Sequence, residues 1–354
     1  MKAARTCSPW QHFPYQSERA WPHGQPGWQY AGCMPLPFLE EIRAAQTLIY
    51  RHMQPTPQLS WPLLNERLGA AAWIKHENHT PVGAFKLRGA LVYLDWIKQT
   101  QPHVHGVVAA TRGNHGQGVA TAARLLGMKA VIVVPRGNSA DKNRAMKAQG
   151  AELLEFGEDF QESLEFARAV AMERGLTMID SFHERLVWGT ATFALELFQG
   201  APPLDVVYVP IGLGSSICGV AAARRALGLQ VEIVGVVAAA APAYALSFRE
   251  HRPVEAPART AIADGLACRI PNPQALELIW ENVARILTVS DEEIIGTMRI
   301  YYEDTHNVAE GAGAAALAGA LQESDLLRRK QVGIVLSGGN VDRKVYASVL
   351  SGEC

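Results

Sequence analysis

The chain has 354 residues, 48% of them hydrophobic, which is enough to bury one large core or two moderate ones. Its net charge is -1, only 19% of its residues are charged, and Lys and Arg are scattered, which argues against a nucleic-acid-binding surface. Five widely spaced cysteines without a CxxC pair, and the lack of a long apolar run, argue against a disulfide framework, a zinc site, a secretory signal and a membrane span.

The chain alternates short apolar runs with helical patterns from residue 35 onward, which is typical of an α/β protein with parallel sheets. Residues 1–34 show neither pattern, and we expect an irregular N-terminal extension there. The expected buried strands are 106–110, 130–135, 206–211, 232–237 and 332–336. The expected helices are 86–97, 115–126, 215–226, 291–302 and 310–321, with Ser290 and Asp291 as candidate caps of the fourth.

Three glycine-containing loops follow expected strands. Their sequences are TRGNHGQ (111–117), GLGSSICG (212–219) and SGGN (337–340). In doubly wound sheets, ligands bind where the carboxyl end of a strand passes into a loop and then a helix. These loops are therefore the first candidates for a binding site.

The GLGSSICG loop predicts an anion cradle at a helix N-terminus. Glycines allow backbone N–H groups to approach a phosphate closely, and two serines add hydroxyl donors; the candidate residues are Gly212, Leu213, Gly214, Ser215 and Ser216. The alternative is a tight turn that binds nothing. A P-loop would need GK[ST], and a dinucleotide-binding loop would need its third glycine earlier, although Glu232 lies where a ribose-binding acid is expected.

Lys86 opens an expected helix between two apolar residues, Phe85 and Leu87. A lone lysine at a helix start is ordinarily a solvated surface charge. Here the positive end of the helix dipole and partial desolvation are expected to lower the pKa of the amine. A neutral amine is the form that attacks a carbonyl carbon, so Lys86 is a candidate nucleophile.

The TRGNHGQ and SGGN loops offer further polar groups. Gly113 and Gly116 are expected to expose N–H donors at a helix N-terminus, and Asn114 offers an amide that can face a ligand. A simple capping turn explains the loop equally well. Ser337 can likewise be an ordinary cap or a ligand-binding hydroxyl.

Together these segments resemble the fold-type II pyridoxal-phosphate (PLP) enzymes of the threonine and serine dehydratase family. AFKLRGA (84–90) is similar to the family's cofactor-lysine motif S-F-K-x-R-G-A, with Ala84 replacing the usual serine. TRGNHGQ is similar to S-x-G-N-H-x-Q, and SGGNVD (337–342) to S-G-G-N-x-D. Three further segments match the family more weakly, in the same order along the chain. They are Gly189–Thr190, Asp264–Leu266 and Glu310–Ala314.

The resemblance implies a two-lobed fold like that of the tryptophan synthase β-subunit, each lobe a twisted, mainly parallel sheet flanked by helices. It implies a large PLP-binding domain of residues 35–105 and 183–354 and a small domain of residues 106–182. The implied cofactor contacts are Lys86, Phe85, Asn114, Gly212, Leu213, Gly214, Ser215, Ser216, Glu310 and Ser337. The implied substrate contacts are Thr111, Arg112, Gly113, Asn114 and His115.

The implied activity is that of an L-threonine or L-serine ammonia-lyase, with Lys86 as the base and 2-oxobutyrate or pyruvate plus ammonia as products. Ser337 beside the pyridine nitrogen would favour β-elimination, because a hydroxyl cannot protonate that nitrogen as a carboxylate would. Racemases of the family carry a second base, a serine, where this chain has Arg112, which is always protonated.

Other functions stay open at this point. Arg112 could assist a side-chain carboxylate, which would suit 3-hydroxyaspartate; β-replacement, racemisation and non-catalytic ligand binding are further alternatives. The stretch 235–242 lacks oxygen-bearing side chains where some relatives bind a cation, so we expect no metal there. The resemblance implies a short form without a C-terminal regulatory domain. We expect a cytoplasmic homodimer or homotetramer that binds a small amino acid, and neither nucleic acid nor membrane.

Overall fold

The computed structural model describes residues 34–353, so the irregular extension expected over residues 1–34 lies outside them except for its last residue. A six-stranded sheet forms the larger part of the fold, and all of its strands are parallel except the first, which pairs antiparallel with the second. In spatial order its strands are β1 (Gln58–Ser60), β2 (Ala71–His76), β10 (Gln331–Leu336), β7 (Val206–Pro210), β8 (Glu232–Ala238) and β9 (Arg285–Val289).

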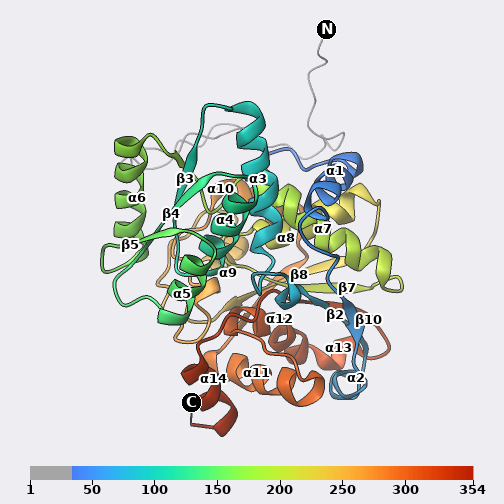
Figure 1. The fold of residues 1–354 in the computed structure, drawn as a ribbon. Helices are drawn as coiled ribbons and strands as arrows, with labels where there is room; N and C mark the ends of the chain where they lie inside the picture. The colour runs from blue at the N-terminus through green and yellow to red at the C-terminus, as the bar shows by residue number, and fades with distance from the viewer. Residues whose placement is uncertain (1–33, 354) are drawn as a thin grey trace.

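A second, four-stranded sheet is parallel throughout. Its strands, in spatial order, are β5 (Glu152–Glu155), β4 (Lys129–Val134), β3 (Gly106–Ala110) and β6 (Thr177–Met178). This sheet lies to one side of the six-stranded sheet, with α6 on its far side (Figure 1). All four strands fall within the expected small domain, although the division of the chain into domains stays a prediction.

Helices cover both sheets. The helices that follow or precede site loops are α3 (Lys86–Thr100), α4 (Asn114–Leu125), α5 (Ala140–Ala148), α7 (Glu184–Gly200), α8 (Ser215–Ala226), α12 (Gly311–Gln322) and α14 (Arg343–Ser351). The others are α1 (Leu39–Ile49), α2 (Pro62–Leu68), α6 (Phe160–Arg174), α9 (Ala243–Glu250), α10 (Pro273–Asn282), α11 (Asp291–Thr305) and α13 (Ser324–Leu327). Two short 3-10 turns, η1 (Glu77–His79) and η2 (Asp264–Leu266), complete the fold.

The buried strands explain why both faces of each sheet need helices. In β7, Val207 and Val209 pack in the core shared with α7 and α8, whereas Val206 and Tyr208 pack in the core shared with α12. Alternate residues of a strand point to opposite faces, so a strand that is apolar throughout is buried on both. The four-stranded sheet behaves likewise: Val108 packs with α6, and its neighbours pack with α3 and α4.

The expected strands and helices are confirmed, with ends shifted by up to three residues. Glu310 was expected to begin a helix, but it is the N-cap residue that precedes α12. Ser290 caps α11 as expected, because its hydroxyl accepts from the Glu293 backbone N–H. Asp291 does not cap that helix; its carboxylate accepts from Thr260 and Ala261 instead.

The α/β class with mainly parallel sheets is thus confirmed. The three candidate loops follow β3, β7 and β10, at the carboxyl ends of the strands as expected. No helix within residues 34–353 has the length and apolarity needed to cross a membrane. Cys218 and Cys268 are both buried free thiols.

Candidate active site

Lys86 is the first residue of α3, and its turn is tied to the SGGN loop. The Phe85 backbone N–H donates to the Ser337 carbonyl oxygen at 3.1 Å, and Ala84 forms an antiparallel bridge with Gly338. The Lys86 Nζ atom lies 4.7 Å from the centre of the Phe85 ring. Two segments far apart in sequence therefore position the lysine jointly.

The Lys86 amine is held in a form suited to chemistry. Burial lowers its pKa to about 8, against the opposing effect of the Glu310 carboxylate. Removal of a charge from water disfavours the ammonium form, which was the physical basis of the sequence prediction. A substantial fraction of the amine is therefore neutral at mildly alkaline pH, when it can act as a nucleophile or a base.

The GLGSSICG loop passes directly from β7 into α8. Gly214 has φ +99°, a backbone conformation that favours glycine, and it is the N-cap residue of α8. Ser215 and Ser216 are buried in the first turn of this helix, where backbone N–H groups lack intrahelical acceptors. The Ser216 Oγ atom has no hydrogen-bond partner among the described residues. An anion such as a phosphate would satisfy these donors.

Two neighbouring contacts hold this loop in place. The Tyr244 hydroxyl donates to the Leu213 carbonyl oxygen at 3.0 Å, and the Thr190 hydroxyl donates to the Ser215 carbonyl oxygen at 2.7 Å. Thr190 lies on α7, whose Gly189 packs so closely against α3 that a Cβ atom there would overlap the Arg88 carbonyl oxygen. The helix α7 therefore connects the loop to the turn that carries the lysine.

The TRGNHGQ loop corrects one expectation. Gly113 and Gly116 do not expose free donors, because both N–H groups donate to the Thr111 Oγ1 atom, at 3.0 and 3.3 Å. Thr111 is buried and serves as an internal acceptor that shapes the loop. The N–H groups of Asn114 and His115, in the first turn of α4, find no acceptor within residues 34–353 and remain available to a carboxylate.

His115 and Arg112 take opposite positions on this loop. His115 is buried, and burial, with a smaller effect of Lys86, lowers its pKa to about 3, so its ring is neutral at physiological pH. Its Nε2 atom has no hydrogen-bond partner among the described residues. Arg112 is exposed and has no carboxylate partner in residues 34–353. Within residues 34–353, the loop thus carries one neutral ring whose Nε2 atom is unpaired and one cation without a carboxylate partner.

The SGGN loop, α4 and α12 meet at Glu310. The Asn114 Nδ2 atom donates to Glu310 Oε1 at 2.5 Å, and the Glu310 N–H donates to the Gly338 carbonyl oxygen. Burial raises the pKa of Glu310 to about 7, although Lys142, Asn114 and Lys86 oppose the change. Ser337 is buried at the end of β10, and its hydroxyl makes a long contact of 3.4 Å with the Ala312 carbonyl oxygen.

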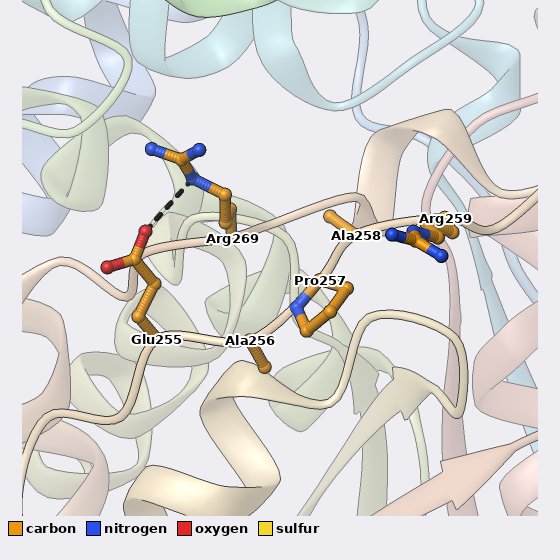
Figure 2. A pocket seen from close by; sticks show the side chains of 6 residues that line it. All are labelled: Glu255, Ala256, Pro257, Ala258, Arg259 and Arg269. Atoms are coloured by element: carbon orange, nitrogen blue, oxygen red, sulfur yellow. Dashed lines mark ion pairs between the residues drawn. The ribbon is translucent and has the colours of Figure 1, made fainter.

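A small cleft beside Glu310 contains Lys142, which the sequence did not single out, and Asn340, to which the sequence assigned no role within the SGGN loop. The Lys142 ammonium lies 3.1 Å from the Asp264 carboxylate. Helix α5 therefore contacts Asp264–Leu266, one of the segments with a weaker match to the family. The larger surface pocket in Figure 2 is lined by none of the predicted site residues. It contains an ion pair between Glu255 and Arg269.

The side of α3 opposite Lys86 carries a buried ion network that the sequence did not reveal. Arg88 is fully buried and donates to both carboxylate oxygens of Glu77 and of Glu196, at distances from 2.6 to 3.0 Å. The Lys75 ammonium completes the network at 2.5 Å from Glu196. A lysine, a glutamate and an arginine in KHENHTPVGAFKLR were visible in the sequence, but their meeting with Glu196 depends on the packing of α7.

Comparison with known proteins decides the family. Residues 49–338 match the family described as pyridoxal-phosphate dependent enzyme. The chain belongs to this family. The suspected family and its dependence on PLP are therefore confirmed.

Similar proteins carry out several reactions. An L-threo-3-hydroxyaspartate ammonia-lyase of Saccharomyces cerevisiae is 36% identical, over 90% of this chain and 98% of that protein. An L-threonine ammonia-lyase of Thermotoga maritima is 33% identical, over 88% of this chain and 78% of that protein. The structure of maize serine racemase superposes with a TM-score of 0.83 at 29% identity, over 90% of this chain and 98% of the other. The family membership thus leaves the substrate and the outcome of the reaction to be proposed.

The described residues fit PLP. Within residues 34–353, the Ser216 hydroxyl and the first N–H groups of α8 lack partners, which suits a phosphate. The partly neutral Lys86 amine suits the aldehyde carbon. Asn114 and Ser337 offer polar atoms for the ring, from loops that contact the lysine turn. Phe85 contributes an apolar surface next to the amine.

Proposed function

We propose that the chain is a PLP-dependent ammonia-lyase that removes water from L-threonine, L-serine or both, and releases 2-oxobutyrate or pyruvate with ammonia. The observation that carries the proposal is the Lys86 amine, buried so that its pKa is about 8, on a turn that is tied to the SGGN loop. Lys86 supplies a base for one face of the substrate. On the TRGNHGQ loop, Arg112 offers no base for the other face, because a guanidinium stays protonated.

PLP, when bound, supplies the electron sink that makes the Cα proton of an amino acid acidic. Gly212 to Ser216 would hold its phosphate, and Asn114 and Ser337 its ring substituents. The N–H groups of Asn114 and His115 would bind the substrate carboxylate. Lys86 would then remove the Cα proton. The His115 ring, which is neutral, would add no second charge beside this proton transfer.

The proposal is tested by the products formed by purified holoenzyme from L-threonine and L-serine. We expect 2-oxo acid and ammonia in equal amounts, with no D-amino acid formed at a comparable rate. Lys86→Ala should lose the activity and the visible absorption of the bound cofactor, while Lys98→Ala, on the same helix, keeps both. A D-amino acid as the main product would overturn the lyase proposal in favour of a racemase.

Arg112 favours a second candidate substrate, L-threo-3-hydroxyaspartate. Its guanidinium is exposed beside the proposed carboxylate site and lacks a carboxylate partner within residues 34–353, so it can bind a second substrate carboxylate. A relative with this activity is 36% identical to the chain. The measurement is kcat/KM for hydroxyaspartate and threonine in the wild type and in Arg112→Gln: a selective loss toward hydroxyaspartate supports this candidate, and an equal change toward both contradicts it.

We further propose a cytoplasmic homodimer or homotetramer whose partner is a small amino acid. The balanced charge of -1 gives no reason to expect nucleic acid as a ligand. Light scattering coupled to size-exclusion chromatography measures the oligomeric state directly, and a monomer would contradict it.

A further inference from the structure

The amide of Asn340 has its orientation fixed by the backbone. Its Nδ2 atom donates to the Val82 carbonyl oxygen at 2.8 Å and to the Asn114 Oδ1 atom at 2.8 Å. A backbone carbonyl only accepts hydrogen bonds, so the nitrogen of the Asn340 amide, and not its oxygen, must face Val82. The two hydrogens of this nitrogen are thereby assigned, one to each acceptor.

The orientation of Asn340 fixes that of Asn114. Because Asn340 presents a donor, Asn114 must present its amide oxygen there, and its nitrogen is turned toward Glu310, at 2.5 Å from Oε1. One N–H of Asn114 is used in this contact, and the second N–H has no acceptor within residues 34–353. Toward a ligand, Asn114 is therefore a hydrogen-bond donor, and its oxygen is occupied.

The surroundings leave Asn340 little freedom. Gly83 adopts φ +69°, and a Cβ atom built on it would lie 2.7 Å from Asn340 Oδ1, so the absence of a side chain makes room for this amide. The Gly339 N–H donates to the Gly83 carbonyl oxygen at 2.9 Å, which holds the two loops together. The chain of contacts runs from Val82 through Asn340 and Asn114 to Glu310.

We propose that Asn340 is a positioning residue, which holds the Asn114 amide with its N–H directed at the ring hydroxyl oxygen of PLP. A donor at this place stabilises the ionised form of that oxygen, which a reversed amide, presenting its own oxygen, would destabilise. The inference rests on the cofactor and on the position proposed for its ring. It is independent of which amino acid the enzyme transforms and of whether the reaction is elimination or racemisation.

The test uses holoenzyme without substrate. Asn340→Asp is nearly isosteric but offers a carboxylate, which can donate to neither Val82 nor Asn114, so the Asn114 amide loses its fixed orientation. We expect the visible absorption band of the bound cofactor to lose intensity to the near-ultraviolet band, and the Kd for PLP to rise about tenfold, the effect of one lost hydrogen bond. Asn340→Ala should change both quantities in the same direction.

Asn65→Ala is the matched control. Asn65 lies on α2, and its side-chain amide bonds to Ser60 on β1 and Ala72 on β2, so its role is structural. This variant should leave the band ratio unchanged whatever it does to stability. The double variant Asn114→Ala with Asn340→Ala should show no spectral change beyond that of Asn114→Ala alone, because Asn340 acts through Asn114.

Two results would overturn the inference. One is a wild-type band ratio and PLP affinity in the folded Asn340 variants; the other is a spectral effect that adds to that of Asn114→Ala. If Asn340→Asp does not fold, Asn340→Ala, which removes the amide without adding a charge, provides the spectrum in its place. Because no amino acid is added, a wrong assignment of substrate or reaction would leave these results unchanged.

Discussion

The first turn of α3 separates two buried polar clusters with opposite character. Residues two apart on a helix point to opposite sides, so Lys86 and Arg88 face different surroundings. Behind the turn, the scaffold cluster consists of Lys75, Glu77, Arg88 and Glu196, and its charges balance in number. In front lies the site cluster, in which the polar atoms are only partly satisfied. It consists of Lys86, Asn114, His115, Ser216, Glu310 and Ser337.

The two clusters differ in whether their polar groups have hydrogen-bond partners among the described residues. Arg88 directs its guanidinium nitrogens to Glu77, Glu196, Thr56 and Thr192, all within the protein. In the site cluster, Ser216 Oγ and His115 Nε2 have no partner among the described residues, and the pKa values of Lys86 and Glu310 lie far from their ordinary range. Buried polar groups are nearly always bonded, and unpaired groups that lie together with strongly shifted pKa values fit a ligand-binding place.

The largest expected effect comes from breaking the scaffold cluster. Arg88→Met leaves two buried carboxylates without their main cation, and the free energy of unfolding should fall by about 3–5 kcal/mol. Urea unfolding of cofactor-free protein measures this loss. Arg136→Met is the control, because Arg136 pairs with Glu158 on the surface and water screens such pairs. Equal losses in the two variants would contradict the distinction between the clusters.

Glu310 gives the next largest effect, and it depends on pH. Burial raises the pKa of Glu310 to about 7, so its contribution to stability is full below pH 4.5 and is lost as pH rises through 7. Glu310→Gln stays neutral and still accepts from Asn114. The variant should therefore match the wild type at low pH and exceed it by about 3 kcal/mol at pH 8, in cofactor-free protein. Parallel pH curves for the two proteins would show that Glu310 ionises freely.

Replacing Lys86 should raise the free energy of unfolding, whereas replacing Arg88 lowers it. Burial lowers the pKa of Lys86 to about 8, so the unfolded chain binds a proton more readily than the folded chain. The resulting loss of folding stability is full below pH 8 and vanishes above about pH 10.5. Lys86→Met keeps the aliphatic chain and removes the amine, so cofactor-free protein should gain about 3 kcal/mol at pH 7. Lys147→Met, at an exposed position on α5, should have little effect. A loss of stability in Lys86→Met would contradict the assignment of the penalty to the amine.

The sequence predicted the site cluster far better than the scaffold cluster, for a physical reason. Lys86, Asn114, Ser216 and Ser337 lie in short segments whose glycines, caps and apolar neighbours all act over a few residues. Local reading therefore places Lys86 at a helix start and the other three after strand ends. Arg88 and Glu196 lie 108 residues apart, and only the packing of α7 against α3 brings them together.

The same limit applies within the site. Asn340 and Asn114 lie 226 residues apart, and nothing local indicates that one amide orients the other. The internal role of Thr111 was missed because a hydroxyl at a strand end serves a ligand or a backbone N–H equally well in sequence. The short strands β1 and β6 escaped notice because two or three residues carry no periodicity.

The smallest expected effect comes from the Ser216 hydroxyl, which we expect to contribute to ligand binding and not to folding stability. Ser216→Ala removes a donor that has no partner among the described residues, so the Kd for PLP should rise about five- to tenfold, or about 1 kcal/mol. The stability of cofactor-free protein should stay the same or increase. Ser247→Ala should do the reverse, because the Ser247 hydroxyl bonds to Ala243 and Val254 within the protein. If Ser216→Ala instead destabilised the cofactor-free chain and left the affinity for PLP unchanged, Ser216 would belong with the scaffold.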